Sequence, residues 1–257
     1  MMIWSEPATG HGSVTVTVPN RSALFDDVAE RFDAKRGFSV ATLNLDHVVK
    51  LKRDPAFRAA YAAHSHITAD GNPIVWLSRL AGQSDVSLVP GSELIDPLAK
   101  IAAEKGVPVG LFGATDDSLE AAAEALKVRY PGLQVVITLA PPMGFDPDGP
   151  AADEAIAKIG ESGARLVFLA LGAPKQERFA ARAQKALPEA GFLSIGAGLD
   201  FISGAQVRAP AWARAIAAEW LWRLLGSPRR LAARYGACIL ALPGLTLRAL
   251  SSRLKGA

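Results

Sequence analysis

Short apolar segments alternate with helical segments along most of this chain, and this alternation limits its fold more than any other feature. Arg165–Leu171 is apolar at every position after its first, which is typical of a strand buried on both faces of a sheet. Strands that alternate with helices in this way form a parallel sheet with helices on both sides. The sequence therefore predicts an α/β fold, with strands at Phe38–Leu45, Val107–Phe112, Leu133–Leu139, Arg165–Leu171 and Gly191–Ile195.

Local signals add detail to this outline. Val14–Val18 and Val86–Val89 also have strand character, and the residues before Val14 are expected to form a loose leader. Asp46 is the expected N-cap of the helix after the first sheet strand, and Asp117 or Ser118 is expected to cap a later helix. We therefore predict a leader of residues 1–20, followed by an α/β body of residues 21–205.

The pattern changes after Pro210, where no further strand is expected. Ala211–Leu225 and Arg229–Leu242 have helical character, and Gly226–Pro228 and Pro243-Gly244 are expected to end these two helices. Residues 206–257 are therefore predicted to form a C-terminal helical appendage.

The charge of the chain is unevenly distributed. The net charge is +3, but residues 206–257 alone carry +8, and the rest of the chain carries −5. A basic segment on an acidic body is expected to meet phosphate groups, a membrane surface or nucleic acid. The alternative is that the basic residues only form a solvated helix face.

Composition excludes several kinds of protein. The single cysteine, Cys238, rules out a disulfide framework and a cysteine-based zinc site, and four histidines leave little room for a histidine-rich metal site. The longest apolar runs have about ten residues, whereas a membrane-spanning helix needs about 20, so no span is expected. The N-terminus lacks a basic segment followed by an apolar one, so no signal peptide is expected and a cytoplasmic location follows.

Two motifs that resemble cofactor sites are interpreted otherwise. Gly110–Gly113 lacks the spacing of the dinucleotide-binding fingerprint, which argues against an NAD-dependent enzyme. Asp146 and Asp148 resemble a metal-binding acid pair, but prolines and glycines surround them and favour a turn. The sequence therefore predicts neither a metal nor another cofactor.

Polar residues follow several predicted strands. Ligands of open α/β sheets bind beyond the carboxyl ends of the strands, so these residues are candidates for a site. Thr42 and Asn44 end one strand, although both could instead satisfy the N-terminus of the next helix. Asp70 precedes Gly-Asn-Pro and is alternatively a turn residue, and Gly113 and Asp200 follow two other strands.

The segment Gly172–Glu177 has the character of an anion-binding loop. A glycine at a strand end lets a ligand approach the backbone, and a helix that begins at Pro174 offers unpaired N–H groups. Lys175 adds a positive charge and Gln176 a flexible amide. This combination suits a diphosphate and the hydroxyl groups of a sugar.

Seven segments between residues 38 and 235 resemble, in the same order, motifs of the WecG/TagA/CpsF glycosyltransferases (glycosyltransferase family 26). The resemblance does not extend to residues 1–20 or to the tail after residue 236, and Leu88 stands where the family often has arginine. The segments are Thr42–His47, Asp70–Trp76, Gly91–Leu94, Leu171–Glu177, Gly196–Phe201, Gly204–Pro210 and the pair Glu219–Leu224 with Pro228–Arg230.

The resemblance implies a Rossmann-like α/β body with a C-terminal helical appendage. It also implies an inverting transferase without metal or cofactor, which moves a hexose-type sugar from a UDP-sugar to a polyprenyl diphosphate-linked sugar. Members of the family do this at the cytoplasmic face of the membrane, in the synthesis of cell wall polymers and exopolysaccharides. The expected partners are this donor, this acceptor and the membrane surface, with no nucleic acid, and a homo-oligomer is compatible with the resemblance.

The resemblance also assigns roles to residues. Asp70 matches the family's proposed general base, which takes the proton of the attacking hydroxyl group. Substrate binding is expected at Thr42, Asn44, Gly113, Gly172, Lys175, Gln176 and Asp200. Contact with the acceptor diphosphate or the membrane is expected at Arg208, Arg223, Arg230 and Arg234.

Two other hypotheses stay open at this point. The chain could be a non-catalytic membrane- or nucleic-acid-binding protein that uses only its basic segment, and a titration with UDP separates this hypothesis from an enzyme. It could also be a different nucleotide-sugar enzyme such as an epimerase, against which the missing dinucleotide fingerprint counts.

Overall fold

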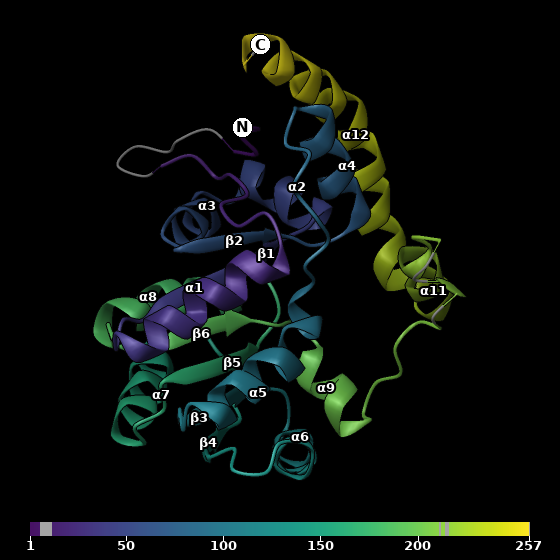
Figure 1. The fold of residues 1–257 in the computed structure, drawn as a ribbon. Coiled ribbons are helices and arrows are strands. Elements are labelled where there is room, and N and C mark those ends of the chain that lie inside the picture. Colours follow the sequence, from purple (N-terminus) through teal and green to yellow (C-terminus); the bar gives the residue numbers. More distant parts are fainter. Residues whose placement is uncertain (6–11, 211, 214–215, 257) are drawn as a thin grey trace.

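Six strands in the described part of the chain form one parallel sheet, which confirms the predicted α/β fold (Figure 1). The structure is a computed structural model that describes residues 1–5, 12–210, 212–213 and 216–256, with the side chains of Arg223 and Arg230 outside the description. The strand order is β2-β1-β6-β5-β3-β4. The strands are β1 (Phe38–Leu43), β2 (His66–Ala69), β3 (Val109–Gly113), β4 (Val135–Leu139), β5 (Leu166–Ala170) and β6 (Gly191–Ser194).

Helices cover both faces of the sheet (Figure 1). On one face α1, α5 and α6 share an apolar cluster with sheet residues such as Phe168, and on the other α7 and α8 pack with Val167 and Leu169. Over β1 and β2, that second face is covered by α2, α3 and α4. The helices are α1 (Arg21–Asp33), α2 (Leu45–Arg53), α3 (Pro55–Ala62), α4 (Asn72–Leu80), the short 3₁₀ helix η1 (Gly91–Glu93), α5 (Ile95–Glu104), α6 (Asp116–Arg129), α7 (Pro150–Glu161) and α8 (Lys175–Ala186).

Two segments with strand character are extended but do not join the sheet as strands. The backbone N–H groups of Thr17 and Val18 both donate to the carbonyl of Ile67, and the N–H of Val89 donates to Ala69. The strand predictions for Val14–Val18 and Val86–Val89 are therefore wrong, because each segment makes only a few bonds beside β2 instead of a ladder. Strand β2 itself was not predicted, since Ile67 is the only large apolar residue among its four positions.

The start of the chain is not a loose leader where it is described. Met2, Trp4, Val14 and Val16 are buried, and they pack in one cluster with Leu245 of the C-terminal helix. The two ends of the chain therefore share a core with α2 and α4.

Helix caps lie a little earlier than predicted. Asn44, not Asp46, caps α2, because its side-chain oxygen accepts the N–H of His47. Thr115, not Asp117 or Ser118, caps α6 in the same way. In each case the first polar residue after the strand takes the cap position.

The C-terminal region contains α9 (Gly198–Ser203), α11 (Glu219–Gly226) and α12 (Pro228–Gly256). The predicted helix 211–225 is wrong at residues 216–218, which are not helical. The predicted break at Pro243-Gly244 is also wrong, because α12 continues through Pro243. A proline inside a helix costs about 3 kcal/mol. Packing on both sides offsets this cost, since Leu231 and Cys238 are buried before Pro243, and Leu245 after it.

Helix α12 is longer than the apolar runs considered in the sequence. The stretch Leu231–Lys255 is long and apolar enough to cross a membrane by length and composition alone, since it contains an 18-residue window with a mean hydropathy of 1.2. Counting uninterrupted apolar runs missed it, because single polar residues divide the sequence. One face of α12 packs against α2 and α4 along the flank of the molecule, and the opposite face is exposed (Figure 1).

Candidate active site

Asp70 and Thr42 meet at the carboxyl ends of the neighbouring strands β2 and β1. The backbone N–H of Asp70 donates to the carbonyl of Leu43 at 2.7 Å, which fixes the chain at this point. The Thr42 hydroxyl lies 3.3 Å from Oδ2 of Asp70 and donates to it. Thr42 is buried, so its contact orients the half-buried carboxylate of Asp70 at the strand ends.

Asn44 is the N-cap of α2. Its side-chain oxygen accepts the N–H of His47 at 3.0 Å and caps α2. The helix-terminus interpretation is therefore confirmed for Asn44, whereas Thr42 contacts Asp70 instead.

The next two strands of the sheet, β6 and β5, are each followed by a glycine with open space beside its backbone. Gly172, after β5, has φ +71°, and Gly196, after β6, has φ +57°. At both positions an added Cβ would meet no atom within 4 Å. Lys175 is the first residue of α8, whose N-terminal N–H groups follow the Gly172 loop. Together these features leave room for an anion at the backbone.

Gln176 ties these two strand ends together. Its Oε1 accepts the N–H of Gly196 at 3.1 Å, and its Nε2 donates to Oε1 of Glu177 at 2.9 Å. Both side chains are buried. The described contacts of Gln176 are thus internal, and they set the position of the Gly196 turn relative to α8.

A layer of buried polar side chains lies beneath the site, and sequence reasoning did not single it out. Burial lowers the pKa of His47 to about 3, so His47 is neutral, and its Nδ1 lies 2.9 Å from the Tyr61 hydroxyl. Burial raises the pKa of Tyr61, and the charges of Glu177 and Asp70 raise it further. Burial also raises the pKa of Glu177 to about 7. His47 and Glu177 lie at the ends of two motif segments, but the sequence did not predict that they lie close to Tyr61, because the three residues come from three different helices.

Gly113 and Asp200 lie at the other side of the strand ends. A Cβ on Gly113 would stand 2.5 Å from the backbone of Ala170, so close packing of β3 against β5 explains the glycine. Asp200 accepts hydrogen bonds from Ser118 at 3.0 Å and from Gln206 at 2.7 Å. The bond from Ser118 joins α9 to the first turn of α6, and the bond from Gln206 joins α9 to the segment that follows it.

Two of the described arginines of the C-terminal region, Arg208 and Arg234, contact the body. Nη2 of Arg208 donates to the carbonyl of Ser92 at 2.7 Å, and its guanidinium lies 5.1 Å from the ring centre of Phe201. Arg234 forms an ion pair with Asp46 at 3.1 Å. The side chains of Arg223 and Arg230 lie outside the described residues.

The acid pair is a turn, as predicted. Oδ1 of Asp146 accepts the N–H of Asp148 at 3.0 Å, and Asp148 forms an ion pair with Arg178. Both carboxylates are thus engaged within the protein. No group of three or more acidic, histidine or cysteine side chains placed to hold a metal ion occurs in the described part of the chain.

The fold and these strand ends define an α/β protein with an aspartate at one side and an open glycine loop at the other. Residues 12–257 match the model of the Glycosyl transferase WecG/TagA/CpsF family, and the chain belongs to this family. The match includes the tail and part of the leader, which the recognised motifs did not reach.

Two relatives of known activity are similar to most of the chain. Both are described as N-acetylglucosaminyldiphosphoundecaprenol N-acetyl-beta-D-mannosaminyltransferases. The protein of Bacillus spizizenii is 30% identical over 200 residues, which cover 77% of this chain and 75% of the relative. The protein of Bacillus subtilis is 26% identical over 214 residues, which cover 82% of this chain and 80% of the relative.

Proposed function

We propose that this protein moves a hexose-type sugar from a UDP-sugar to a polyprenyl diphosphate-linked sugar, with inversion and without a metal ion. The names of the two Bacillus relatives support the acceptor class, since both use a diphosphoundecaprenol-linked N-acetylglucosamine. The observation that carries the proposal is the position of Asp70, which Thr42 orients at the edge of an open strand-end site.

The spacing of the strand ends suits a single displacement. Thr42 lies near the carboxyl end of β1, and Asp70, Gly196 and Gly172 follow β2, β6 and β5. These strands are consecutive in the sheet in the order β2-β1-β6-β5. Neighbouring strands are about 4.8 Å apart, so Asp70 and the Gly172 loop are separated by about 14 Å. A sugar and its diphosphate fit between them, with the attacking hydroxyl group on one side of the anomeric carbon and the leaving group on the other.

Asp70 acts as the general base in this mechanism. The acceptor oxygen forms a bond with the anomeric carbon while its proton passes to the Asp70 carboxylate. The bond between the anomeric carbon and the diphosphate oxygen breaks, and UDP leaves with the electron pair. A positioned base of this kind contributes about 10²–10⁴-fold to the rate.

Protein cations and backbone N–H groups stabilise the departing diphosphate. The Gly172 loop and the first turn of α8 supply N–H groups, and Lys175 supplies a positive charge. The engagement of Asp146 and Asp148 in a turn and an ion pair supports a mechanism in which these cations replace a metal.

Transfer is tested with the purified protein, a panel of UDP-sugars and a synthetic short-chain lipid diphosphate-N-acetylglucosamine. We expect UDP release that depends on both substrates and persists in EDTA, and a product of inverted anomeric configuration by NMR. Turnover that needs an added metal ion, or retention of configuration, would overturn those parts of the proposal. Absence of UDP binding by calorimetry would favour the non-catalytic hypothesis.

The exposed face of α12 is proposed to dock on the cytoplasmic membrane surface, where the lipid-linked acceptor resides. Leu240, Leu247 and Leu254 are 83%, 69% and 81% exposed and recur every seven residues, so they form one stripe. Helix α12 has no acidic residue, and Arg248, Arg253 and Lys255 accompany the stripe. Apolar burial and anionic lipid attraction of about 1 kcal/mol per basic residue act together at such a surface.

Vesicle flotation tests this docking. Leu247→Glu should weaken binding to vesicles with anionic lipid, and raising the salt concentration should weaken binding of the parent protein. Activity on the short-chain acceptor in detergent should stay unchanged in this variant. Undiminished flotation of Leu247→Glu at low salt would contradict docking through this face.

A further inference from the structure

The appendage is connected to the Gly172 loop through two side chains of α2. Oδ2 of Asp46 lies 3.1 Å from Nη2 of Arg234 and 2.8 Å from Nζ of Lys50. Nζ of Lys50 also lies 3.4 Å from the carbonyl oxygen of Ala173, the residue after Gly172. A cation of α12 therefore reaches the glycine loop in three successive polar contacts.

Packing fixes Arg234 in this position. Leu231 and Cys238, three residues before and four residues after Arg234, are buried, and α12 packs against α2 of the body. Residues at this spacing share one face of a helix, so Arg234 leaves α12 from its docked face. The side chain of Asp46 is only 11% exposed, and it needs its cationic partners because an unpaired carboxylate at such a site is costly.

We propose that Arg234 is a positioning residue. With α12 packed on the body, Arg234 holds the Gly172 loop in place through Asp46 and Lys50. It does not bind the acceptor diphosphate. The inference rests on the proposed function, because it assigns the Gly172 loop to the donor diphosphate. It changes the role expected for Arg234 from the sequence.

The two roles predict different kinetic changes. Loss of a positioning contact loosens the donor loop, so the KM for UDP-sugar and the Kd for UDP rise while the KM for the acceptor stays constant. Loss of a direct acceptor contact raises the acceptor KM and leaves UDP binding unchanged.

A double-mutant cycle provides the test, with UDP binding by calorimetry and both KM values measured on the short-chain acceptor. Arg234→Gln and Asp46→Asn should each raise the UDP Kd and donor KM about three- to tenfold. The UDP Kd of the double variant should be no higher than that of the weaker-binding single variant, because both changes break the same ion pair. In a Lys50→Met background, Arg234→Gln should have no further effect on the UDP Kd.

Two controls separate positioning from a general loss of structure. Arg234→Lys keeps the charge and should restore the UDP Kd to within about twofold of the parent. Arg229→Gln removes an exposed arginine from the first turn of the same helix and should change neither constant. Melting temperatures show that each variant is folded.

Three results would overturn the inference: an unchanged UDP Kd in Arg234→Gln, a rise confined to the acceptor KM, or effects of Arg234→Gln and Asp46→Asn that multiply. Failure of the proposed function itself looks different. In that case the parent protein binds no UDP or transfers no sugar, whatever the variants do.

Discussion

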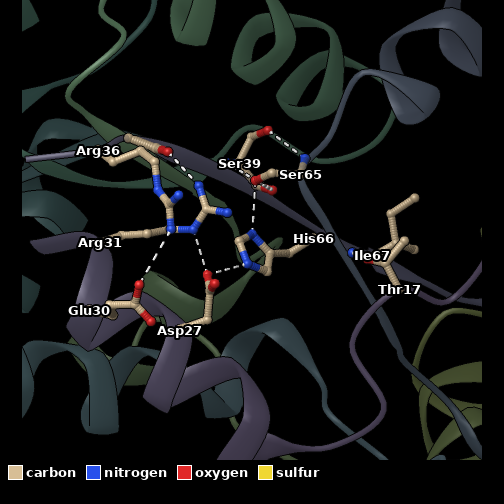
Figure 2. A network of polar contacts seen from close by, with 10 residues as sticks. Thr17, Asp27, Glu30, Arg31, Arg36, Ser39, Ser65, His66 and Ile67 are labelled. Atoms are coloured by element: carbon tan, nitrogen blue, oxygen red, sulfur yellow. Dashed lines mark hydrogen bonds and ion pairs between the residues drawn. The ribbon is translucent and has the colours of Figure 1, made fainter. Parts of the chain in front are cut away.

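The two ends of the β1–β2 strand pair use their polar side chains in opposite ways. At the amino end, Asp27 of α1 accepts from Arg31 at 2.5 Å and lies 2.6 Å from Nε2 of His66, as Figure 2 shows. The Ser65 hydroxyl lies 2.8 Å from Nδ1 on the other side of the His66 ring, and it also contacts the backbone of Ser39 (Figure 2). These groups bind one another and join α1 to the start of both strands.

The carboxyl end adjoins open backbone. Thr42 contacts Asp70 there at 3.3 Å, a longer bond than those around Asp27, and the adjoining strand ends carry Gly172 and Gly196 with free space around them. A polar cluster is therefore more informative about function when it adjoins open backbone than when its members hydrogen-bond only with one another. Changes at the amino end should therefore affect stability, and changes at the carboxyl end activity.

The largest effect is expected at Asp70. Asp70→Asn keeps the size of the side chain and removes the base, so kcat should fall by about 10²-fold or more. The UDP Kd and the urea midpoint should stay close to those of the parent. A variant that retains most of its turnover at saturating acceptor would remove Asp70 from the mechanism and weaken the contrast between the two ends.

Asp27 provides the opposite result at the amino end. Asp27→Ala leaves Arg31 and His66 without their shared acceptor, which should lower the free energy of unfolding by about 1–3 kcal/mol in urea titrations. The kcat should change by less than about twofold, since this network lies at the far end of the strands. Asp26→Ala, at the exposed neighbouring acid, is the control and should cost less than about 0.5 kcal/mol.

A matched pair of glycines brackets β5 and sharpens the comparison. Gly163 precedes the strand with φ +72° and Gly172 follows it with φ +71°, and neither has an atom within 4 Å of an added Cβ. Valine should strain both positions similarly, so both variants should lose similar stability. Only Gly172→Val should raise the donor KM, by about tenfold, because a side chain there occupies the proposed diphosphate position. Equal donor KM values in the two folded variants would place the donor elsewhere.

The sequence predicted what depends on local pattern and on the order of elements. The strands β1, β3, β4, β5 and β6 and the helices between them follow from their apolar periodicity, and the polar strand ends follow from the rule for parallel sheets. What depends on distant partners was not predictable. Val86–Val89 has the local character of a strand but makes only isolated backbone hydrogen bonds with its neighbours. Helix α12 continues through Pro243 because the residues on both sides of the proline pack against the rest of the protein.

The candidate site shows the same limit. The motifs pointed to Asp70 and Gly172, but the ion pair between Asp46 and Arg234 joins residues 188 positions apart, and no local signal marks it. The sequence instead predicts Asp46 as a helix cap, a role that Asn44 fills. Because Asn44 caps α2, the carboxylate of Asp46 is available for the ion pair with Arg234.

The smallest effect concerns the titration of His66 in the amino-end network. Burial lowers the pKa of His66, although Asp27 opposes this, and burial lowers those of His47 and His64 to about 3 and 4. Below pH 6.5 the unfolded chain therefore binds protons that the folded chain does not, so stability falls as the pH decreases. Glu177 opposes this between about pH 4.5 and 7, because its raised pKa means that the folded state holds a proton there.

His66→Gln isolates one part of this dependence. Urea titrations between pH 5 and 7 should show that the free energy of unfolding falls less steeply with decreasing pH in the variant than in the parent. The two slopes should differ by less than the contribution of one proton, which is about 1.4 kcal/mol per pH unit. The reduction is below a full proton because Asp27 partly restores the affinity of folded His66 for a proton. Most of the slope should remain, since His47 and His64 lie in the interior and cannot titrate until the chain opens. A variant with the full slope of the parent would mean that His66 titrates in the folded state as it does in water, and that its contact with Asp27 is formed by the charged ring.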